Sequence, residues 1–372
     1  MGERVLYLMH VPWGWIKQRP HFIAENLSKY YKVNVFYKKA YKKNNLVKNE
    51  ISNDLNNLVI KELFRLPFER YNLIQEIGSI IIKFQLKKII NQFDIIWLTH
   101  PKLFGIIKGI LPKNIKIIYD CMDDAIEFLP KKCSFKIKEK IINDERELIK
   151  RSKIIFTSSN YLKQKLISRY NINEKIYVIN NAIFLDKIDS YYDTEVPFYI
   201  KDKLEKIKIK LMYIGTVSKW IDMDLIIQSL KQYKEITYIF FGPKDINLPK
   251  HNRLLYFGPI EHKYIFKIME EADALIMPFK KNELILSVDP VKLYEYIFSS
   301  KPSIAVEYGE TLKFKEYVYL YKNKNEYLNL IKNLIKGNLP PKKSLEECRK
   351  FALENTWGKR TDTIINLIET KF

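Results

Sequence analysis

Residues 272–306 read ADALIMPFKKNELILSVDPVKLYEYIFSSKPSIAV. Two short apolar runs, 274–277 and 303–306, flank a polar loop and an amphipathic stretch that begins at Pro290. Proline suits the first turn of a helix because its missing N–H group has no partner there. The segment therefore predicts a strand, a helix and a second strand, as in the βαβ units of parallel sheets.

The start of this predicted helix is suited to an anion, because free N–H groups and the helix dipole attract phosphate there. Lys292 and Glu295 lie three residues apart, on one face of the helix, and Ser287 and Asp289 precede them in the loop. A lysine at this place can neutralise phosphate, and a glutamate one turn further on can accept hydrogen bonds from a ribose diol.

The pattern resembles the nucleotide-sugar site of GT-B glycosyltransferases, particularly the family-4-like group, in which a P-x-K-x-x-E-Y segment and a following K-P step recur. The alternative is an ordinary βαβ unit of any doubly wound protein. The resemblance implies two Rossmann-like domains facing across a cleft. It also implies a nucleoside diphosphate sugar as the donor, with no cofactor and no metal ion.

Short apolar runs alternate with helical patterns along the chain, which predicts parallel sheets covered by helices. The predicted strands are 4–9, 32–37, 95–99, 115–119, 154–157 and 176–179, then 209–214, 237–241, 254–257, 274–277 and 303–306. We expect an acceptor-binding domain over 1–187 and a nucleotide-sugar domain over 188–356. A helix over 357–372 is expected to cross back to the first domain.

Composition narrows the function classes. No P-loop or dinucleotide fingerprint occurs, and the five histidines show no metal-binding spacing. The three cysteines are odd in number and far apart, which favours a reducing compartment. The first residues read as a strand rather than a signal peptide, and no run of 18 apolar residues occurs. We therefore expect a cytoplasmic enzyme, peripheral at the inner face of the membrane if it is attached at all.

Positive charge is unevenly spread. The net charge is +21, and residues 1–187 carry 34 Lys and Arg against 18 Asp and Glu, a net +16. Such a half suits nucleic acid or anionic lipid, although the lysines can equally be solvated surface. No RRM, zinc-finger or basic-zipper pattern occurs, so nucleic acid is not expected and an anionic membrane surface is the candidate partner.

In open α/β sheets, ligands bind beyond the carboxyl ends of the strands. His10, His100 and Asp120 follow predicted strands of the first half, while Gly215 and Gly258 follow strands of the second. Side chains in the first half can serve an acceptor, and bare backbone in the second can approach a nucleotide closely. The alternative for each residue is a routine loop.

Residues 10–22 read HVPWGWIKQRPHF and resemble the acceptor loop of bacterial surface-polysaccharide glycosyltransferases, including those proposed for teichuronic acid synthesis. Trp13 and Trp15 can stack on sugar rings, and Arg19 can hold an acceptor phosphate bidentately. The two indoles can equally be core or lid aromatics.

Residues 117–128, IIYDCMDDAIEF, place Asp120, Asp123 and Asp124 where a strand ends and a helix is expected. Clustered carboxylates can raise one another's pKa and so produce a base. We expect Asp120 or Asp123 to be catalytic, together with His100 on the acceptor side. Asp123 or Asp124 can instead cap the helix. Such a D-x-x-D-D step is familiar in GT-B chains.

Residues 212–222, MYIGTVSKWID, provide one cation, Lys219, so the expected diphosphate clamp is Lys219 with Lys292. Many retaining relatives carry a glutamate eight residues before the ribose glutamate, where this chain has Ser287. The donor-sugar contact is therefore altered.

The sequence indicates a glycosyltransferase of hexosyltransferase type that transfers a sugar from a nucleoside diphosphate sugar to a surface polysaccharide or lipid-linked glycan. The alternatives are a GT-B sugar-nucleotide epimerase and a non-catalytic two-domain sugar-binding protein.

Overall fold

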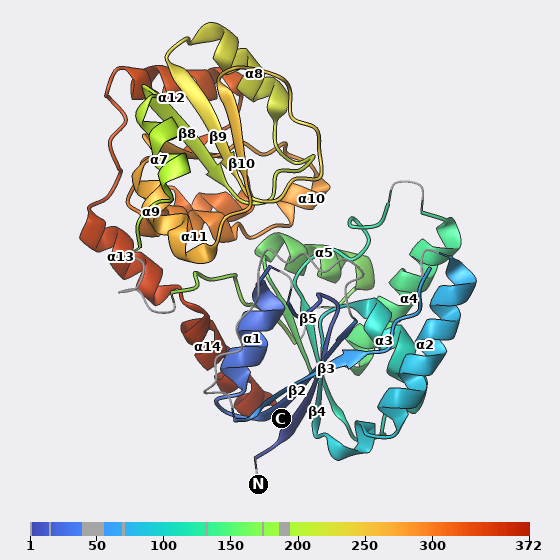
Figure 1. The fold of residues 1–372 in the computed structure, drawn as a ribbon. Coiled ribbons are helices and arrows are strands. Elements are labelled where there is room, and N and C mark those ends of the chain that lie inside the picture. The colour runs from blue at the N-terminus through green and yellow to red at the C-terminus, as the bar shows by residue number, and fades with distance from the viewer. Residues whose placement is uncertain are drawn as a thin grey trace. The chain divides into compact units, whose positions relative to one another are not determined.

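The computed structural model describes residues 2–14, 16–38, 56–68, 71–130, 133–172, 175–185 and 194–372. The chain forms two compact units (Figure 1): unit 1 is Met1–Asn181 with Trp357–Phe372, and unit 2 is Ala182–Thr356. The domain boundary expected at residues 187 and 188 lies outside the described residues.

Unit 1 is built on a parallel sheet with the strand order β3-β2-β1-β4-β5-β6-β7. Its central strands are continuous apolar runs because helices cover both faces of the sheet. The strands are β1 (Arg4–Met9), β2 (Lys32–Lys38), β3 (Leu58–Leu63), β4 (Ile95–Leu98), β5 (Lys116–Cys121), β6 (Ile154–Thr157) and β7 (Ile176–Val178).

The helices of unit 1 lie on both faces of this sheet (Figure 1). One core joins Leu6 and Leu8 of the sheet to Ile82, Leu103 and Leu148 of the covering helices. On the other face α1 packs against α14. The helices are α1 (Arg19–Leu27), α2 (Asn72–Lys87), α3 (Pro101–Ile107), α4 (Phe135–Arg151), α5 (Asn160–Tyr170) and α14 (Trp357–Lys371), with 3₁₀ turns η1 (Ile90–Gln92) and η2 (Lys108–Ile110).

Unit 2 repeats the plan with a parallel sheet ordered β10-β9-β8-β11-β12-β13. Its strands are β8 (Ile209–Ile214), β9 (Ile236–Phe241), β10 (Leu254–Gly258), β11 (Ala274–Met277), β12 (Ser303–Val306) and β13 (Tyr319–Tyr321). Its helices are α7 (Phe198–Glu205), α8 (Met223–Gln232), α9 (Ile265–Glu270), α10 (Glu283–Leu286), α11 (Val291–Phe298), α12 (Lys324–Ile335) and α13 (Leu345–Glu354), with 3₁₀ turns η3 (His262–Tyr264) and η4 (Gly309–Phe314).

The predicted α/β class and the parallel sheets are confirmed. Two edge strands were not predicted: β3 mixes exposed polar residues with apolar ones, and β13 has only three residues. The helix expected to begin with Pro290 in its first turn begins instead at Val291, so Pro290 is its N-cap residue. Within the described residues, no helix is both long and apolar enough to cross a membrane.

Candidate active site

Lys292 of α11 lies across Gly215, the residue that follows β8. A Cβ atom at position 215 would overlap Lys292 Cε and Nζ and would lie 3.1 Å from its Cδ. The ammonium group lies 5.7 Å from the centre of the Tyr213 ring. The lysine therefore occupies its place only because residue 215 has no side chain.

Three glycines end the neighbouring strands β8, β9 and β10. The Gly215 N–H donates to the Phe241 carbonyl at 2.7 Å, and the Gly242 N–H donates to the Gly258 carbonyl at 2.8 Å. A Cβ on Gly242 would overlap the Gly215 carbonyl. The predicted site residues Gly215 and Gly258 thus belong to a surface of bare backbone at the carboxyl ends of the strands, with Lys292 across it.

Lys292 and Glu295 lie one turn apart on α11. Burial lowers the pKa of Lys292, and the negative charge of Glu295 opposes that shift. The Glu295 side chain is 14% exposed, and its Oε1 lies 4.0 Å from Nε2 of His262. Sequence reasoning did not single out His262, although it follows the end of β10 in the loop expected near the nucleotide.

Ser287 and Asp289 are each only 1% exposed. The Ser287 hydroxyl donates to the Leu284 carbonyl at 2.7 Å, and Asp289 forms an ion pair with Lys313. The Tyr294 hydroxyl donates to Asp289 Oδ2 at 3.4 Å. These contacts hold the loop before α11, and donor binding by the two residues stays a prediction.

Lys219 is exposed, and it makes no hydrogen bond or ion pair to another residue in the part of the chain that the structure describes. Its ammonium group is therefore available to a ligand. Of the two predicted clamp lysines, Lys292 is fixed by packing and Lys219 is not.

Arg19 and Asp120 form a buried ion pair in unit 1. Arg19 Nη2 and Nε donate to Asp120 Oδ1 at 2.8 and 3.0 Å, and Nη1 donates to the Ile179 carbonyl at 2.6 Å. The two residues are 4% and 0% exposed. The expected roles, acceptor phosphate binding by Arg19 and proton transfer by Asp120, need correction because each group is already occupied by the other.

Asp123 is half-buried, and among the described residues its carboxylate has no hydrogen-bond or ion-pair partner, while its backbone carbonyl accepts the Cys121 thiol at 3.5 Å. Burial raises the pKa of Asp123 to about 6; Arg19 opposes this shift, and the charges of Asp120 and Asp124 add to it. A carboxylate with this pKa near neutrality is suited to accept a proton.

Asp124 has a structural role instead. It forms an ion pair with Arg169 at 2.7 Å and with Lys165 at 3.0 Å, and it accepts the Ile126 N–H at 2.9 Å. The segment it caps, residues 125–128, is a turn and not the expected helix.

The structure brings His10 and His100 together, at the ends of β1 and β4, with ring centres 5.1 Å apart. Burial lowers the pKa of both, for His10 to about 4, so both are neutral at pH 7. The His100 Nδ1 accepts the Lys102 N–H at 3.1 Å, which leaves Nε2–H as a donor. His100 is therefore arranged to donate a hydrogen bond, and its catalytic role stays a prediction.

Trp13 packs on His21, with ring centres 5.1 Å apart, and within the described residues its buried indole N–H has no hydrogen-bond partner. His21 Nδ1 accepts the Gln18 N–H at 3.1 Å, so its Nε2–H donates to the Pro12 carbonyl at 3.2 Å. These contacts fix the loop before α1. Trp15 lies outside the described residues.

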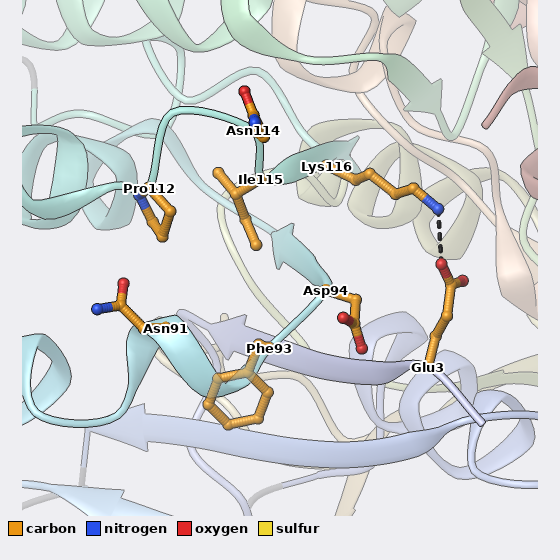
Figure 2. Close-up of a pocket in the computed structure, with 8 residues that line it drawn as sticks. All are labelled: Glu3, Asn91, Phe93, Asp94, Pro112, Asn114, Ile115 and Lys116. Carbon is orange, nitrogen blue, oxygen red and sulfur yellow. Dashed lines mark hydrogen bonds and ion pairs between the residues drawn. The ribbon is translucent and has the colours of Figure 1, made fainter. Parts of the chain in front are cut away.

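A shallow pocket of about 510 Å³ lies at the opposite end of the unit 1 sheet, at the amino ends of β1, β4 and β5 (Figure 2). Lys116 and Glu3 form an ion pair of 2.6 Å across it. Because ligands of such sheets bind at the carboxyl ends, this pocket is not the candidate site. The described residues contain no group of three His, Cys, Asp or Glu side chains that could hold a metal ion.

Solved structures with the same arrangement of elements span the whole chain. HepE of Anabaena, crystallised with UDP and with UDP-glucose, matches at a TM-score of 0.72 and 12% identity, over 99% of this chain and all of HepE. Sucrose-phosphate synthase of Thermosynechococcus elongatus also matches at 0.72, with 11% identity, over 99% of this chain and 98% of its own. This chain has the GT-B fold.

One curated protein is similar to this chain in sequence. TuaH of Bacillus subtilis (strain 168), named as a teichuronic acid biosynthesis glycosyltransferase, is 25% identical over 238 residues. The match covers 61% of this chain and 59% of TuaH, which is less than two thirds of that protein. No family model matches the chain. The predicted resemblance to GT-B glycosyltransferases is confirmed, and neither the epimerase nor the sugar-binding alternative is favoured.

Proposed function

We propose that this protein is a glycosyltransferase that moves a sugar from a nucleoside diphosphate sugar to a surface polysaccharide or a lipid-linked glycan. The observation that carries the proposal is Lys292 lying across Gly215, at the carboxyl end of β8, in a chain with the GT-B fold. A partly desolvated ammonium group beside bare backbone is suited to a diphosphate.

Sugar transfer breaks the bond between the anomeric carbon and the diphosphate oxygen, so negative charge grows on the leaving group. Fixed positive groups that meet this charge lower the barrier. Lys292, Lys219 and the free N–H groups in the first turn of α11 have this role in the proposal. They supply the charge neutralisation that a divalent cation would otherwise provide, so the proposed reaction uses no metal ion and no cofactor.

The nucleoside is proposed to bind beside these cations. Glu295 accepts hydrogen bonds from the ribose hydroxyls, with His262 next to it. The backbone from Gly258 to Glu261 reads the base. Since HepE binds UDP and UDP-glucose, UDP-sugars are the first donors to test.

The acceptor is proposed to bind at the carboxyl ends of the unit 1 strands. Asp123 orients or deprotonates the acceptor hydroxyl, while His10, His100 and Trp13 contact the glycan. The Arg19–Asp120 ion pair is a positioning element beneath them. If the acceptor is lipid-linked, the enzyme works at the inner face of the membrane, attached peripherally through its basic half.

The test is donor binding and turnover in matched lysine variants. We expect a UDP-sugar to raise the melting temperature of the protein more than GDP- or dTDP-sugars do. We also expect a metal chelator to leave the rate of UDP release from the UDP-sugar unchanged. Lys292→Ala should lower turnover by about 10- to 150-fold, the cost of losing one charge-assisted contact. Lys231→Ala, an exposed lysine on α8, is the control and should be neutral. The proposal would be refuted if none of the nucleotide sugars bound, or if Lys292→Ala transferred sugar at the parental rate.

A further inference from the structure

Helix α2 carries an exposed apolar stripe on the face that points away from the sheet. Leu73, Ile77, Ile80 and Phe84 are 69%, 44%, 53% and 63% exposed. Their spacing of four, three and four residues places them in one row along the helix. Such a row in water is unusual for a helix of a globular protein.

The opposite face of α2 already supplies the core. Ile82 and Leu86 are each 1% exposed and belong to the cluster that packs on the sheet. The helix is therefore apolar on two faces, and packing within unit 1 explains only one of them. Three further exposed aromatic residues precede the helix: Phe64, Phe68 and Tyr71.

The charges at the carboxyl end of the stripe are positive, whereas Glu76 lies beside its amino end, three residues after Leu73. Lys87 and Lys88 are exposed and follow Phe84 by three and four residues, so they continue the same face at its carboxyl end. Glu76 is the acidic residue of the helix. The stripe thus ends in two lysines within a half of the chain that carries a net +16.

We propose that this stripe seats α2 in the headgroup layer of an anionic lipid bilayer, with the helix parallel to the membrane surface. An apolar row flanked by lysines is the pattern of interfacial helices. The row from Leu73 to Phe84 is about 16 Å long at 1.5 Å per residue, which suits a surface contact. A second copy of this chain is disfavoured as the occupant because it would bring together two halves that each carry a net charge of +16.

The proposed function includes peripheral attachment to the membrane, and this inference rests on it: the stripe on α2 is the surface that contacts the bilayer. Membrane binding and sugar transfer are read by separate measurements. If donor binding fails while vesicle binding persists, the proposed function fails and this inference stands; the reverse outcome removes only the inference.

The experiment is sedimentation of the full chain with vesicles of phosphatidylcholine, with and without phosphatidylglycerol, at low and high salt. We expect binding to the anionic vesicles at low salt. The triple variant Ile77→Gln/Ile80→Gln/Phe84→Gln should lower the partition coefficient at least tenfold. Lys87→Gln/Lys88→Gln should lower it by about fivefold for each lysine at low salt. The control Leu345→Gln/Leu353→Gln changes two exposed apolar residues of α13 and should bind like the parent.

Each variant is also checked by thermal unfolding, which should match the parent because the changed side chains are exposed. Absence of parental binding to anionic vesicles at low salt overturns the inference, and so does parental binding by the triple variant. A parental dimer that the triple variant converts to a monomer would identify a second copy as the occupant and would equally overturn it.

Discussion

Replacing Gly215 by alanine perturbs the donor site through one methyl group. The new Cβ would occupy the space of Lys292 Cε and Nζ. The end of a lysine side chain is flexible, so the fold can survive by moving the ammonium group. The substitution therefore displaces the cation without removing it, which makes it a test of position rather than of charge.

The expected magnitude follows from the contact that is lost. A charge-assisted contact to the leaving diphosphate contributes about 1.5–3 kcal/mol, so displacement should lower kcat/KM by about 10- to 150-fold. The backbone φ of +153° adds strain on the order of 1–3 kcal/mol to the folded state. Gly337→Ala is the matched control because its φ of +74° imposes strain while a Cβ there meets nothing within 4 Å.

The assay is UDP-sugar turnover in a double-mutant cycle of Gly215→Ala and Lys292→Ala. If the glycine acts by making room for the lysine, Gly215→Ala should lower turnover very little in a protein that already carries Lys292→Ala. Gly337→Ala should lower stability and leave turnover unchanged. Additive effects of the two site variants would refute the reasoning, because the glycine would then act independently of the lysine.

Four further outcomes are expected. Glu295→Gln should weaken nucleotide binding at least about tenfold by calorimetry with the fold intact, and unchanged affinity would remove it from the site. Asp123→Asn should bind donor normally but lose roughly 10²–10⁴-fold in transfer, and in the parent the rate should fall below about pH 6 as this carboxylate takes up a proton. Asp120→Asn should lower the unfolding free energy of unit 1, measured in urea, by about 3–5 kcal/mol, because it leaves Arg19 as an unpaired buried cation. The double variant Arg19→Met/Asp120→Leu should recover that stability. A single variant that is as stable as the parent but transfers no sugar would instead show that Asp120 is catalytic. Because burial lowers the pKa of His21 to about 4, the unfolded chain binds the proton more readily between pH 4 and 6.5, and the contribution of His21 to the unfolding free energy should fall by about 2 kcal/mol from pH 7 to pH 5. His10 and His100 add to the same fall, so His21→Gln should remove about 2 kcal/mol of it and leave the rest.

The strands were predictable because buried parallel strands carry their signal in one continuous apolar run. Residues 274–277 and 303–306 are such runs, and they are β11 and β12 of the structure. The edge strand β3 has no such run because its Lys61 and Glu62 face solvent. Edge position is a property of the assembled sheet, and a local window of sequence does not contain it.

The sequence predicted where the candidate site residues lie in the fold, but it did not predict which other residues they contact. The rule that chemistry follows strand ends selected His10, His100, Asp120 and Gly215, and the structure places all of them there. The Arg19–Asp120 ion pair joins residues 101 positions apart, and no spacing rule indicates such a pair. Because Arg19 pairs with Asp120, the carboxylate whose lone pairs stay available is that of Asp123.

The return of α14 to unit 1 has a consequence for the order in which the protein folds during synthesis. The Trp357 ring stacks on Phe22 of α1 at 5.1 Å, and the Tyr30 hydroxyl donates to Asp362 at 2.8 Å. The ribosome must make all of Ala182–Thr356 between these partners, which takes roughly 10–35 s at about 5–20 residues per second. During that interval the outer face of α1 has no α14 to cover it. Unit 2, which is one uninterrupted stretch of chain, can complete its core first, so the half that is translated first is the half that finishes last.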